Sequence, residues 1–186
     1  FIARQPRYVA HLRYMIAMVV ATDKNRVIGR ENKIPWRLKD DLVLLRNLTQ
    51  NHAVILGRKT YDSMLWYYEK SGKPMPGKMY VIVTRDAAYM PVRENAVVAH
   101  SIEEALQVAR TFDEQIFVNG GASIYEALLP YAERIYLTEV QAQAAGDVYF
   151  PSLDAQAWQE VSREHHVKGD RNEYDFDVVV LDKIAS

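Results

Sequence analysis

QIFVNGGASIYEALLP, residues 115–130, joins an apolar run to a helical pattern through two adjacent glycines. Apolar runs of this kind recur along the chain. Several are continuously apolar rather than alternating, which is typical of strands buried on both faces of a sheet. We expect strands at these runs, which are 16–21, 52–57, 79–84, 96–100, 115–121 and 134–140.

Helical patterns lie between the expected strands. In SIEEALQVAR, Ser101 and Glu104 have the spacing of a capping box, which marks a helix start. Strands that alternate with helices predict an α/β fold with a mostly parallel central sheet and helices on both faces. The expected helices are 38–49, 59–66, 101–110 and 122–130.

The end of the chain has a different pattern. QEVSREHHV and EYDFDVVVLDK flank the turn-rich KGDRN, and we expect them to form a closing antiparallel hairpin. His165 and His166 are adjacent in this hairpin and so face opposite sides, which argues against a shared metal, and we expect no metal site. Residues 66–78 contain two prolines, two glycines and three lysines, so we expect a long loop there.

The composition describes one ordinary globular domain of 186 residues, long enough to bury a sizeable core. The 23 basic and 24 acidic residues leave a formal net charge of −1. This balance argues against nucleic acid as a partner, because duplex binders need a basic excess. The absence of cysteine excludes a thiolate metal site and a cysteine nucleophile, and fits a cytoplasmic protein. No apolar run approaches the roughly 20 residues of a membrane helix, so we expect no membrane partner.

The first 14 residues hold three arginines and a histidine, no acidic residue and no initiating methionine. They lack the apolar segment of a secretory signal. Met15 directly precedes an apolar run. We therefore expect residues 1–14 to be an N-terminal extension outside the fold, with a transit peptide as the alternative, and residues 15–186 to form the single domain.

NKIPWRLKDDLVLLRNL, residues 32–48, places a carboxylate on the apolar stripe of an expected helix. Asp40 is explained as a first-turn residue that complements the helix dipole. The helix dipole does not explain Asp41, because a buried ionised carboxylate is costly without a partner and no basic residue on its face of the helix provides one. A bound ligand with adjacent N–H donors would provide such a partner, so we infer a functional role for Asp41. The residues that share its stripe are Leu38, Leu45 and Leu48.

Three expected strand ends carry glycines, hydroxyls or cations, in VNGGASIY, LGRKT and TRD. Ligands bind outside the carboxyl ends of parallel strands, and free N–H groups at a helix start suit a phosphate. Arg58, Lys59 and Arg85 could then surround a polyphosphate. Each feature alone is equally compatible with a tight turn or a solvated surface charge.

Six motifs resemble bacterial dihydrofolate reductases in order and spacing: VIGRENKIPWRLKDDL, VILGRKTYDSM, KPMPGK, VNGGASIY, YLTEV and GDVYFP. The resemblance runs from about Met15 to the C-terminus. It implies a dihydrofolate reductase-like fold, NADPH as cofactor, and reduction of 7,8-dihydrofolate to 5,6,7,8-tetrahydrofolate for one-carbon metabolism. Hydride transfer to C6 and protonation at N5 would complete the reaction. The implied partners are dihydrofolate and antifolate inhibitors, and the implied form is a monomer.

The resemblance also implies roles for site residues, with Asp41, Trp36 and Thr138 as the catalytic set. Asp41 would hold a ring nitrogen and the 2-amino group of the pteridine, Thr138 would support Asp41, and Trp36 would hold an ordered water. Residues 29–36 resemble a mobile loop that closes over the nicotinamide, and Asp147 would steady it. The implied substrate-binding residues are Val19, Ala21, Asp41, Leu42, Leu45, Ser63, Met64, Lys78, Asn119, Tyr125 and Thr138.

On the cofactor side, the resemblance implies that Arg58 and Arg85 face the 2′-phosphate and adenine region of NADPH. Gly120 and Gly121, joined in the family by a cis peptide, would receive the pyrophosphate at a helix start. The residues that would border the nicotinamide are Ala21, Ile28 and Tyr125. The full implied cofactor-binding set is Ala21, Ile28, Gly29, Asn32, Gly57, Arg58, Lys59, Thr60, Thr84, Arg85, His100, Gly120, Gly121, Ala122, Ser123, Ile124 and Tyr125.

The chain departs from the family pattern in four places. Lys78 stands where an arginine usually grips the glutamate carboxylate of the substrate, and a lysine has no planar fork. Leu45 replaces a phenylalanine beside the substrate rings. Asn119 takes a usually apolar place next to the pterin. LWYYEKSG lengthens the segment that follows Met64.

Two alternatives stay open at this point. One is another NADPH reductase of the same fold, such as the pyrimidine reductase of riboflavin synthesis, which a comparison of substrates would distinguish. The other is a binding module that holds a nucleotide or antifolate without turnover, which would bind NADPH but not oxidise it.

Overall fold

The computed structural model describes residues 14–31 and 33–185. The segment expected to be an extension therefore lies outside the described residues apart from Tyr14, and so does Asn32. The Tyr14 ring lies under the guanidinium of Arg110, with 5.2 Å between Cζ and the ring centroid.

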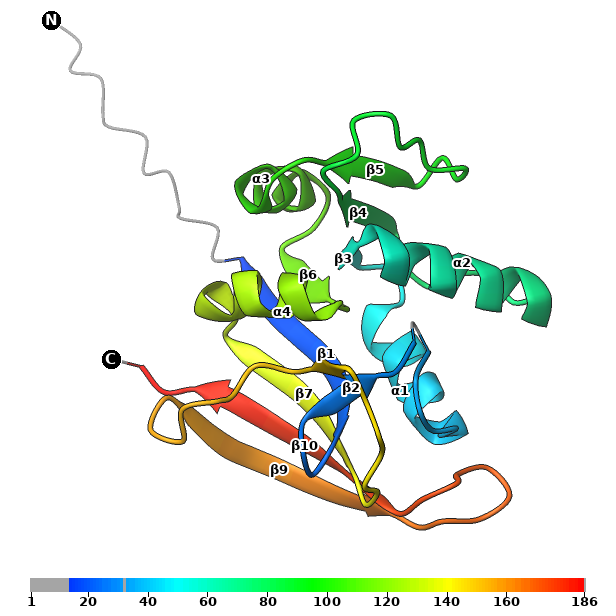
Figure 1. Cartoon of the computed structure of the whole chain (residues 1–186). Helices are drawn as coiled ribbons and strands as arrows, with labels where there is room; N and C mark the ends of the chain where they lie inside the picture. Colours follow the sequence, from blue (N-terminus) through cyan, green and yellow to red (C-terminus); the bar gives the residue numbers. More distant parts are fainter. Residues whose placement is uncertain (1–13, 32, 186) are drawn as a thin grey trace, which may run out of the picture.

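An eight-stranded sheet organises the described chain (Figure 1). Its strands are β1 (Met15–Asp23), β3 (Ala53–Gly57), β4 (Met79–Val83), β5 (Ala96–Ala99), β6 (Gln115–Val118), β7 (Arg134–Val140), β9 (Trp158–His166) and β10 (Phe176–Lys183). Their order is β5-β4-β3-β6-β1-β7-β10-β9. Neighbours from β5 to β7 are parallel, whereas β10 is antiparallel to both β7 and β9. The predicted parallel sheet and closing hairpin are confirmed.

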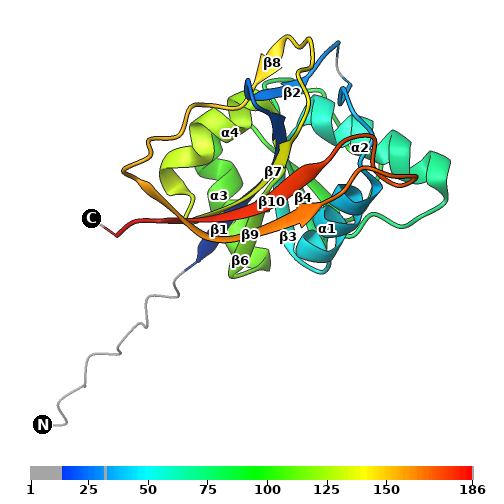
Figure 2. The same cartoon turned by 90° about the horizontal axis from the view of Figure 1, so that it is seen from below.

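Two helices cover each face of this sheet (Figure 2). On one face, α1 (Lys39–Thr49) and α2 (Arg58–Ser71) pack against alternate strand residues such as Val54 and Phe117. On the other, α3 (Ile102–Phe112) and α4 (Ala122–Leu128) pack against the intervening residues. Within the described residues, no helix has the length and apolarity to cross a membrane.

The loop expected at 66–78 is wrong for its first six residues, because α2 continues to Ser71. The extension buries Tyr68 on the face that also holds Tyr61 and Leu65. Lysine is a good helix former, and the prolines that discourage a helix come only at 74 and 76. The helix ends at Gly72, whose φ of 66° is left-handed and whose N–H donates to Glu69 O and Tyr68 O.

Smaller differences concern the ends of elements. The strand expected over 115–121 ends at Val118, and the helix expected to reach residue 130 ends at Leu128. A 3₁₀ turn, Leu129–Tyr131, contains Pro130 and follows it. The predicted helix start is confirmed, since Ser101 Oγ accepts from the Glu104 N–H at 3.0 Å. The Glu104 side chain accepts from the His100 N–H at 2.7 Å rather than from Ser101.

A second, two-stranded sheet was not expected from the sequence. It pairs β2 (Val27–Gly29) with β8 (Val148–Tyr149) in antiparallel fashion. Arg26 fastens it, because its carbonyl accepts from Phe150 N at 2.8 Å and its Nη1 donates to Phe150 O at 2.7 Å. Strands this short carry no readable pattern.

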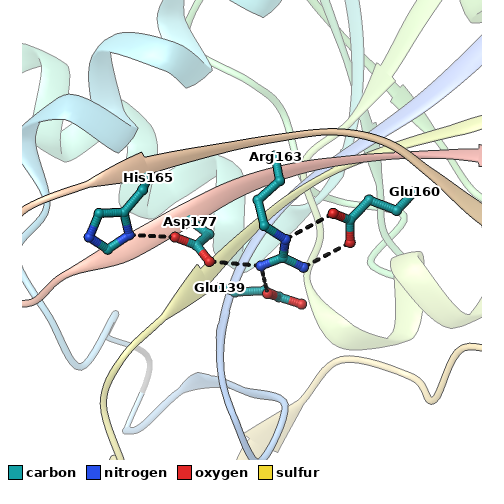
Figure 3. A network of polar contacts seen from close by, with 5 residues as sticks. All are labelled: Glu139, Glu160, Arg163, His165 and Asp177. Carbon is teal, nitrogen blue, oxygen red and sulfur yellow. Dashed lines mark hydrogen bonds and ion pairs between the residues drawn. The ribbon is translucent and has the colours of Figure 1, made fainter.

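The outer face of the hairpin carries a polar network that crosses three strands (Figure 3). Arg163 on β9 makes two bonds with Glu160, at 2.9 and 2.8 Å. It also reaches Glu139 on β7 at 2.6 Å and Asp177 on β10 at 2.8 Å. His165 Nδ1 lies 2.6 Å from the other Asp177 oxygen. We call these five residues the hairpin network.

Candidate active site

Asp41 lies where α1 meets the carboxyl ends of the central strands. Thr138 Oγ1, on β7, donates to Asp41 Oδ1 at 2.6 Å. Thr138 pairs with Ala21 of β1, so Asp41, Thr138 and Ala21 come together from segments far apart in the sequence. The contact expected between Thr138 and Asp41 is therefore present.

The surroundings of Asp41 disfavour its charge. Burial raises the pKa of the Asp41 carboxyl, and the Thr138 hydrogen bond offsets this only in part. No ion pair to Asp41 is found within the described residues, although His166 acts on it at a distance. The same carboxylate is close enough to Tyr125 to add to the effect of burial in raising the pKa of that phenol. Asp41 thus offers an acceptor whose second oxygen has no side-chain or backbone donor among the described residues.

Asp40 has a structural role that the sequence did not reveal. Its oxygens accept from Arg171 Nε at 2.6 Å and from Asn172 Nδ2 at 2.7 Å. These hydrogen bonds, that of Asn172 foremost, lower the pKa of the Asp40 carboxyl. Asp40 therefore ties the start of α1 to the turn between β9 and β10, and leaves Asp41 to face the site.

The segment before α1 is held over the strand ends by polar contacts. Buried Asp23 accepts from Val27 N and Ala144 N, each at 2.9 Å. Asp147 accepts from Glu31 N at 3.2 Å, and its own N–H donates to Gly29 O at 3.1 Å. The expected contact of Asp147 with this loop is thus observed.

Trp36 packs against the part of the sheet that leads into the hairpin. Its side chain is buried with Leu38, Val140 and Phe176. Its indole Nε1 is buried and lacks a partner among the described residues. A buried N–H donor of this kind needs a ligand or an ordered water.

Two helix starts meet at the expected pyrophosphate site. Gly57 N donates to Gly120 O at 2.7 Å, which joins the turn before α2 to the turn before α4. A Cβ built on Gly121 would meet only Thr60 Oγ1, at 3.5 Å. Neither helix start has a side-chain cap, so both leave backbone N–H groups for an anion. The peptide between Gly120 and Gly121 is cis.

Arg58, the first residue of α2, extends its side chain toward the segment that follows β4. Its Nη1 is 3.1 Å from Asp86 Oδ2, and its guanidinium lies 5.7 Å from the Tyr89 ring centroid. His100 Nδ1 lies 2.9 Å from Thr84 O, which connects the ends of β5 and β4. A cation, a histidine and an uncapped helix start are therefore grouped where three parallel strands end.

Comparison with known proteins identifies this arrangement. The family model described as dihydrofolate reductase matches residues 15–183. The dihydrofolate reductase of Staphylococcus haemolyticus is 37% identical over 169 residues, covering 91% of this chain and 96% of that protein. That of Bacillus subtilis strain 168 is 34% identical over 171 residues, covering 91% and 95%. This chain belongs to the dihydrofolate reductase family.

A solved structure agrees with this membership. The dihydrofolate reductase from Enterococcus faecalis complexed with NADP(H) and RAB-propyl has a TM-score of 0.80 to this chain. The two are 28% identical, and the match covers 93% of this chain and 98% of that one.

The other expected site residues differ in their burial and in the face of the sheet that they join. Leu45 and Met64 are partly buried against the core that contains Val19. Tyr125 OH donates to Val19 O at 2.6 Å. Ile28 and Tyr125 share the core on the opposite face. Leu42, Thr60, Gly121 and Ala122 are half-buried, whereas Lys59, Ser63, Arg85 and Ser123 are exposed.

Lys78 is not brought to this group. It precedes β4 and so lies at the amino ends of the parallel strands, whereas the Asp41–Thr138 pair lies toward their carboxyl ends. Its Nζ donates to Phe112 O at 2.9 Å, on the side of α3. A contact of Lys78 with the substrate tail would require it to leave Phe112.

Three residues that shape the site were missed in the sequence. Asp23 and Asn172 give no signal there, because turns with Asp or Asn are common and their partners lie far along the chain. Asp86 does follow Arg85 in TRD, but only the fold shows that it pairs with Arg58. Among the described residues, no cluster of His, Asp and Glu could hold a metal ion.

Proposed function

We propose that this chain reduces 7,8-dihydrofolate to 5,6,7,8-tetrahydrofolate with NADPH. The observation that carries the proposal is the Asp41–Thr138 pair, set at the same strand ends as two uncapped helix starts. Family membership and the NADP(H) complex of the Enterococcus faecalis enzyme support it. A role in one-carbon metabolism follows from the product.

In this proposal the Asp41 carboxylate binds the pteridine ring of the substrate. An ionised carboxylate accepts two hydrogen bonds side by side, which suits a ring N–H next to an amino group. Thr138 occupies one Asp41 oxygen from the side and fixes the orientation of the carboxylate. In this proposal Asp41 anchors the ring and biases its charge, and water is the immediate donor of the proton to N5.

Backbone N–H groups and arginine side chains would bind the phosphates of NADPH. The free N–H groups at the starts of α2 and α4 would hold the pyrophosphate, and Arg58 and Arg85 would face the 2′-phosphate. Ala21, Ile28 and Tyr125 would border the nicotinamide. NADPH supplies the hydride when bound, and the protein supplies position and electrostatics.

The loop and the indole would exclude water. Trp36 caps the site with a buried ring whose N–H is available to a bound molecule. Asp147 and Asp23 hold the strands and turns that border residues 29–36. Excluding water strengthens the interaction of Asp41 with the ring, because fewer competing dipoles remain.

The test follows NADPH oxidation by absorbance with dihydrofolate at neutral pH, for the wild type and Asp41→Asn side by side. We expect the variant to lose on the order of a hundredfold or more in turnover and to regain part of it in acid, where the substrate arrives protonated. Equal turnover by the two proteins at neutral pH would refute the role of Asp41.

A wild type that binds NADPH but does not oxidise it with dihydrofolate would refute the proposed function. The pyrimidine substrate of riboflavin synthesis is the alternative to try in that case. A monomer, a cytoplasmic location and antifolate binding complete the proposal, and gel filtration tests the first of these.

A further inference from the structure

Asn119 is a buried polar residue directly after β6 and directly before the cis Gly120–Gly121 peptide. Its side chain carries a donor and an acceptor. Both amide atoms are buried, and neither has a hydrogen-bond partner among the described residues. Its backbone is satisfied, since Asn119 N donates to Ile55 O at 3.0 Å.

An unpaired buried amide calls for an explanation. Natural proteins pair nearly all buried polar atoms, and leaving one unpaired destabilises the fold. Leucine has a similar shape and would fill the same space without this penalty. Packing alone therefore gives no reason for an asparagine at this position.

Strand alternation places Asn119 on the sheet face covered by α1 and α2. Phe117, two residues earlier, packs in the core on that face, whereas Val118 packs in the core on the other. Because side chains alternate along a strand, Asn119 points to the same side as Phe117. Asp41, on α1, belongs to this same side.

Asn119 also lies at the same strand ends as the Asp41–Thr138 pair. In the sheet order, β6 is next to β1 and β1 is next to β7, so Asn119 and Thr138 are two strands apart. Two strand spacings amount to about 10 Å. A bicyclic ring anchored by Asp41, with the reach of the two side chains, spans this separation.

We propose that the Asn119 carboxamide hydrogen-bonds to the heterocycle of the substrate, as a second polar contact beside Asp41. The inference rests on the proposed function, because it takes the Asp41 side of the sheet as the substrate site. The contact favours ligands that are polar at the edge facing β6. Ligand binding would also give a partner to an amide that has none among the described residues.

The experiment compares the wild type with Asn119→Leu and Asn119→Val. It measures KM for dihydrofolate, KM for NADPH and the melting temperature of the ligand-free protein. We expect KM for dihydrofolate to rise about tenfold, since a ligand group loses its partner in a closed site. KM for NADPH stays unchanged, and the melting temperature holds or rises.

A matched control is Ile116→Val, which alters β6 on the opposite face of the sheet. It should lower the melting temperature by removing buried apolar contacts and leave both KM values unchanged. A structural role for Asn119, such as binding an internal water, would make its variants behave like this control.

Either of two outcomes overturns the inference. One is a KM for dihydrofolate within about twofold of the wild type in both Asn119 variants, a range below the loss of one hydrogen bond. The other is failure of both variants to fold, which would mean that the carboxamide supports the ligand-free protein. Absence of dihydrofolate reduction by the wild type is a different result, because it removes the proposed function itself.

Discussion

Two polar regions of this molecule differ in how completely their hydrogen-bonding groups are paired within the protein. In the hairpin network, which is largely exposed, Arg163 bonds three carboxylates and the half-buried Asp177 also pairs with His165 (Figure 3). At the strand ends beside α1, polar groups are buried or half-buried, and two of them, the Asn119 amide and the Trp36 N–H, have no described partner. The polar groups of the hairpin network bond to one another, whereas some polar groups of the site lack a protein partner and can bind a ligand.

The difference separates stability from function. Exposed polar groups pair at little cost because water solvates whatever is left over. Buried unpaired groups lower stability, and natural proteins retain them mainly at functional sites. Removing a group from the site should therefore impair activity without harming the fold. Removing a group from the hairpin network should leave activity intact.

Among the three variants compared here, Thr138→Val should have the largest effect, and the effect should be on activity. The Thr138 hydrogen bond lowers the pKa of Asp41, so its loss raises that pKa further and makes the ionised form scarcer in acid. We expect kcat/KM for dihydrofolate to fall about tenfold, as for a hydrogen bond to a charged group. The acidic limb of its pH profile should move to higher pH. Thr138→Ser keeps the hydroxyl and should restore both, and a profile that does not move would contradict the assignment.

Asp86→Asn has a smaller effect, of opposite sign. Asp86 pairs with Arg58 at 3.1 Å. In the proposed cofactor site, Asp86 would compete with the 2′-phosphate of NADPH for that guanidinium. An asparagine keeps the oxygen that accepts from Ala88 N but removes the charge. Because both side chains are more than a third exposed, we expect KM for NADPH to fall only about threefold. KM for NADH, which has no 2′-phosphate, is the control, and an equal change for both cofactors would contradict this reading.

Arg163→Met has the smallest expected effect, confined to stability. It removes the centre of the hairpin network, but Arg163 is 39% exposed, so the loss should not exceed about 1 kcal/mol. Urea unfolding in low and high salt measures it, and high salt should shrink the difference by screening. Turnover of dihydrofolate should not change. A large loss of turnover would show that the network supports the site and would break the contrast.

Acid should weaken the hairpin network by protonating the Asp177 carboxylate. Hydrogen bonds from His165 and Arg163 lower the pKa of Asp177 below its usual 3.8. A carboxyl group whose pKa is lower in the folded than in the unfolded protein stabilises the fold at pH values above its unfolded-state pKa. This stabilisation is lost as the pH falls through the folded-state pKa. The loss is therefore confined to the range below about pH 4.

Much of the fold was readable from the sequence because its signals are local. Continuous apolar runs predicted the six strands of the parallel part, and Ser101 with Glu104 predicted a helix start. The order β5-β4-β3-β6-β1-β7 was not readable, since nothing within one strand names its neighbour. The extension of α2 to Ser71 was missed because the helix continues through Lys70 and ends only at Gly72.

The site divides in the same way. Asp41 stood out because a carboxylate on an apolar stripe conflicts with its surroundings, and that conflict is visible within one helix. The partners of Asp40 and Asp23 were hidden, because they lie 132 and 121 residues away along the chain. The unpaired state of Asn119 could be seen only once its burial and its neighbours were known.

The most direct measurement is the urea unfolding of ligand-free wild type and Asp41→Asn at pH 7, repeated with dihydrofolate. Burial raises the pKa of Asp41, so folding disfavours its charge, and stability falls as pH rises from 3.8 through that raised value. We predict that Asp41→Asn is the more stable protein alone and gains less from dihydrofolate. A variant that is less stable alone, or that gains as much as the wild type, would contradict a carboxylate kept for the ligand.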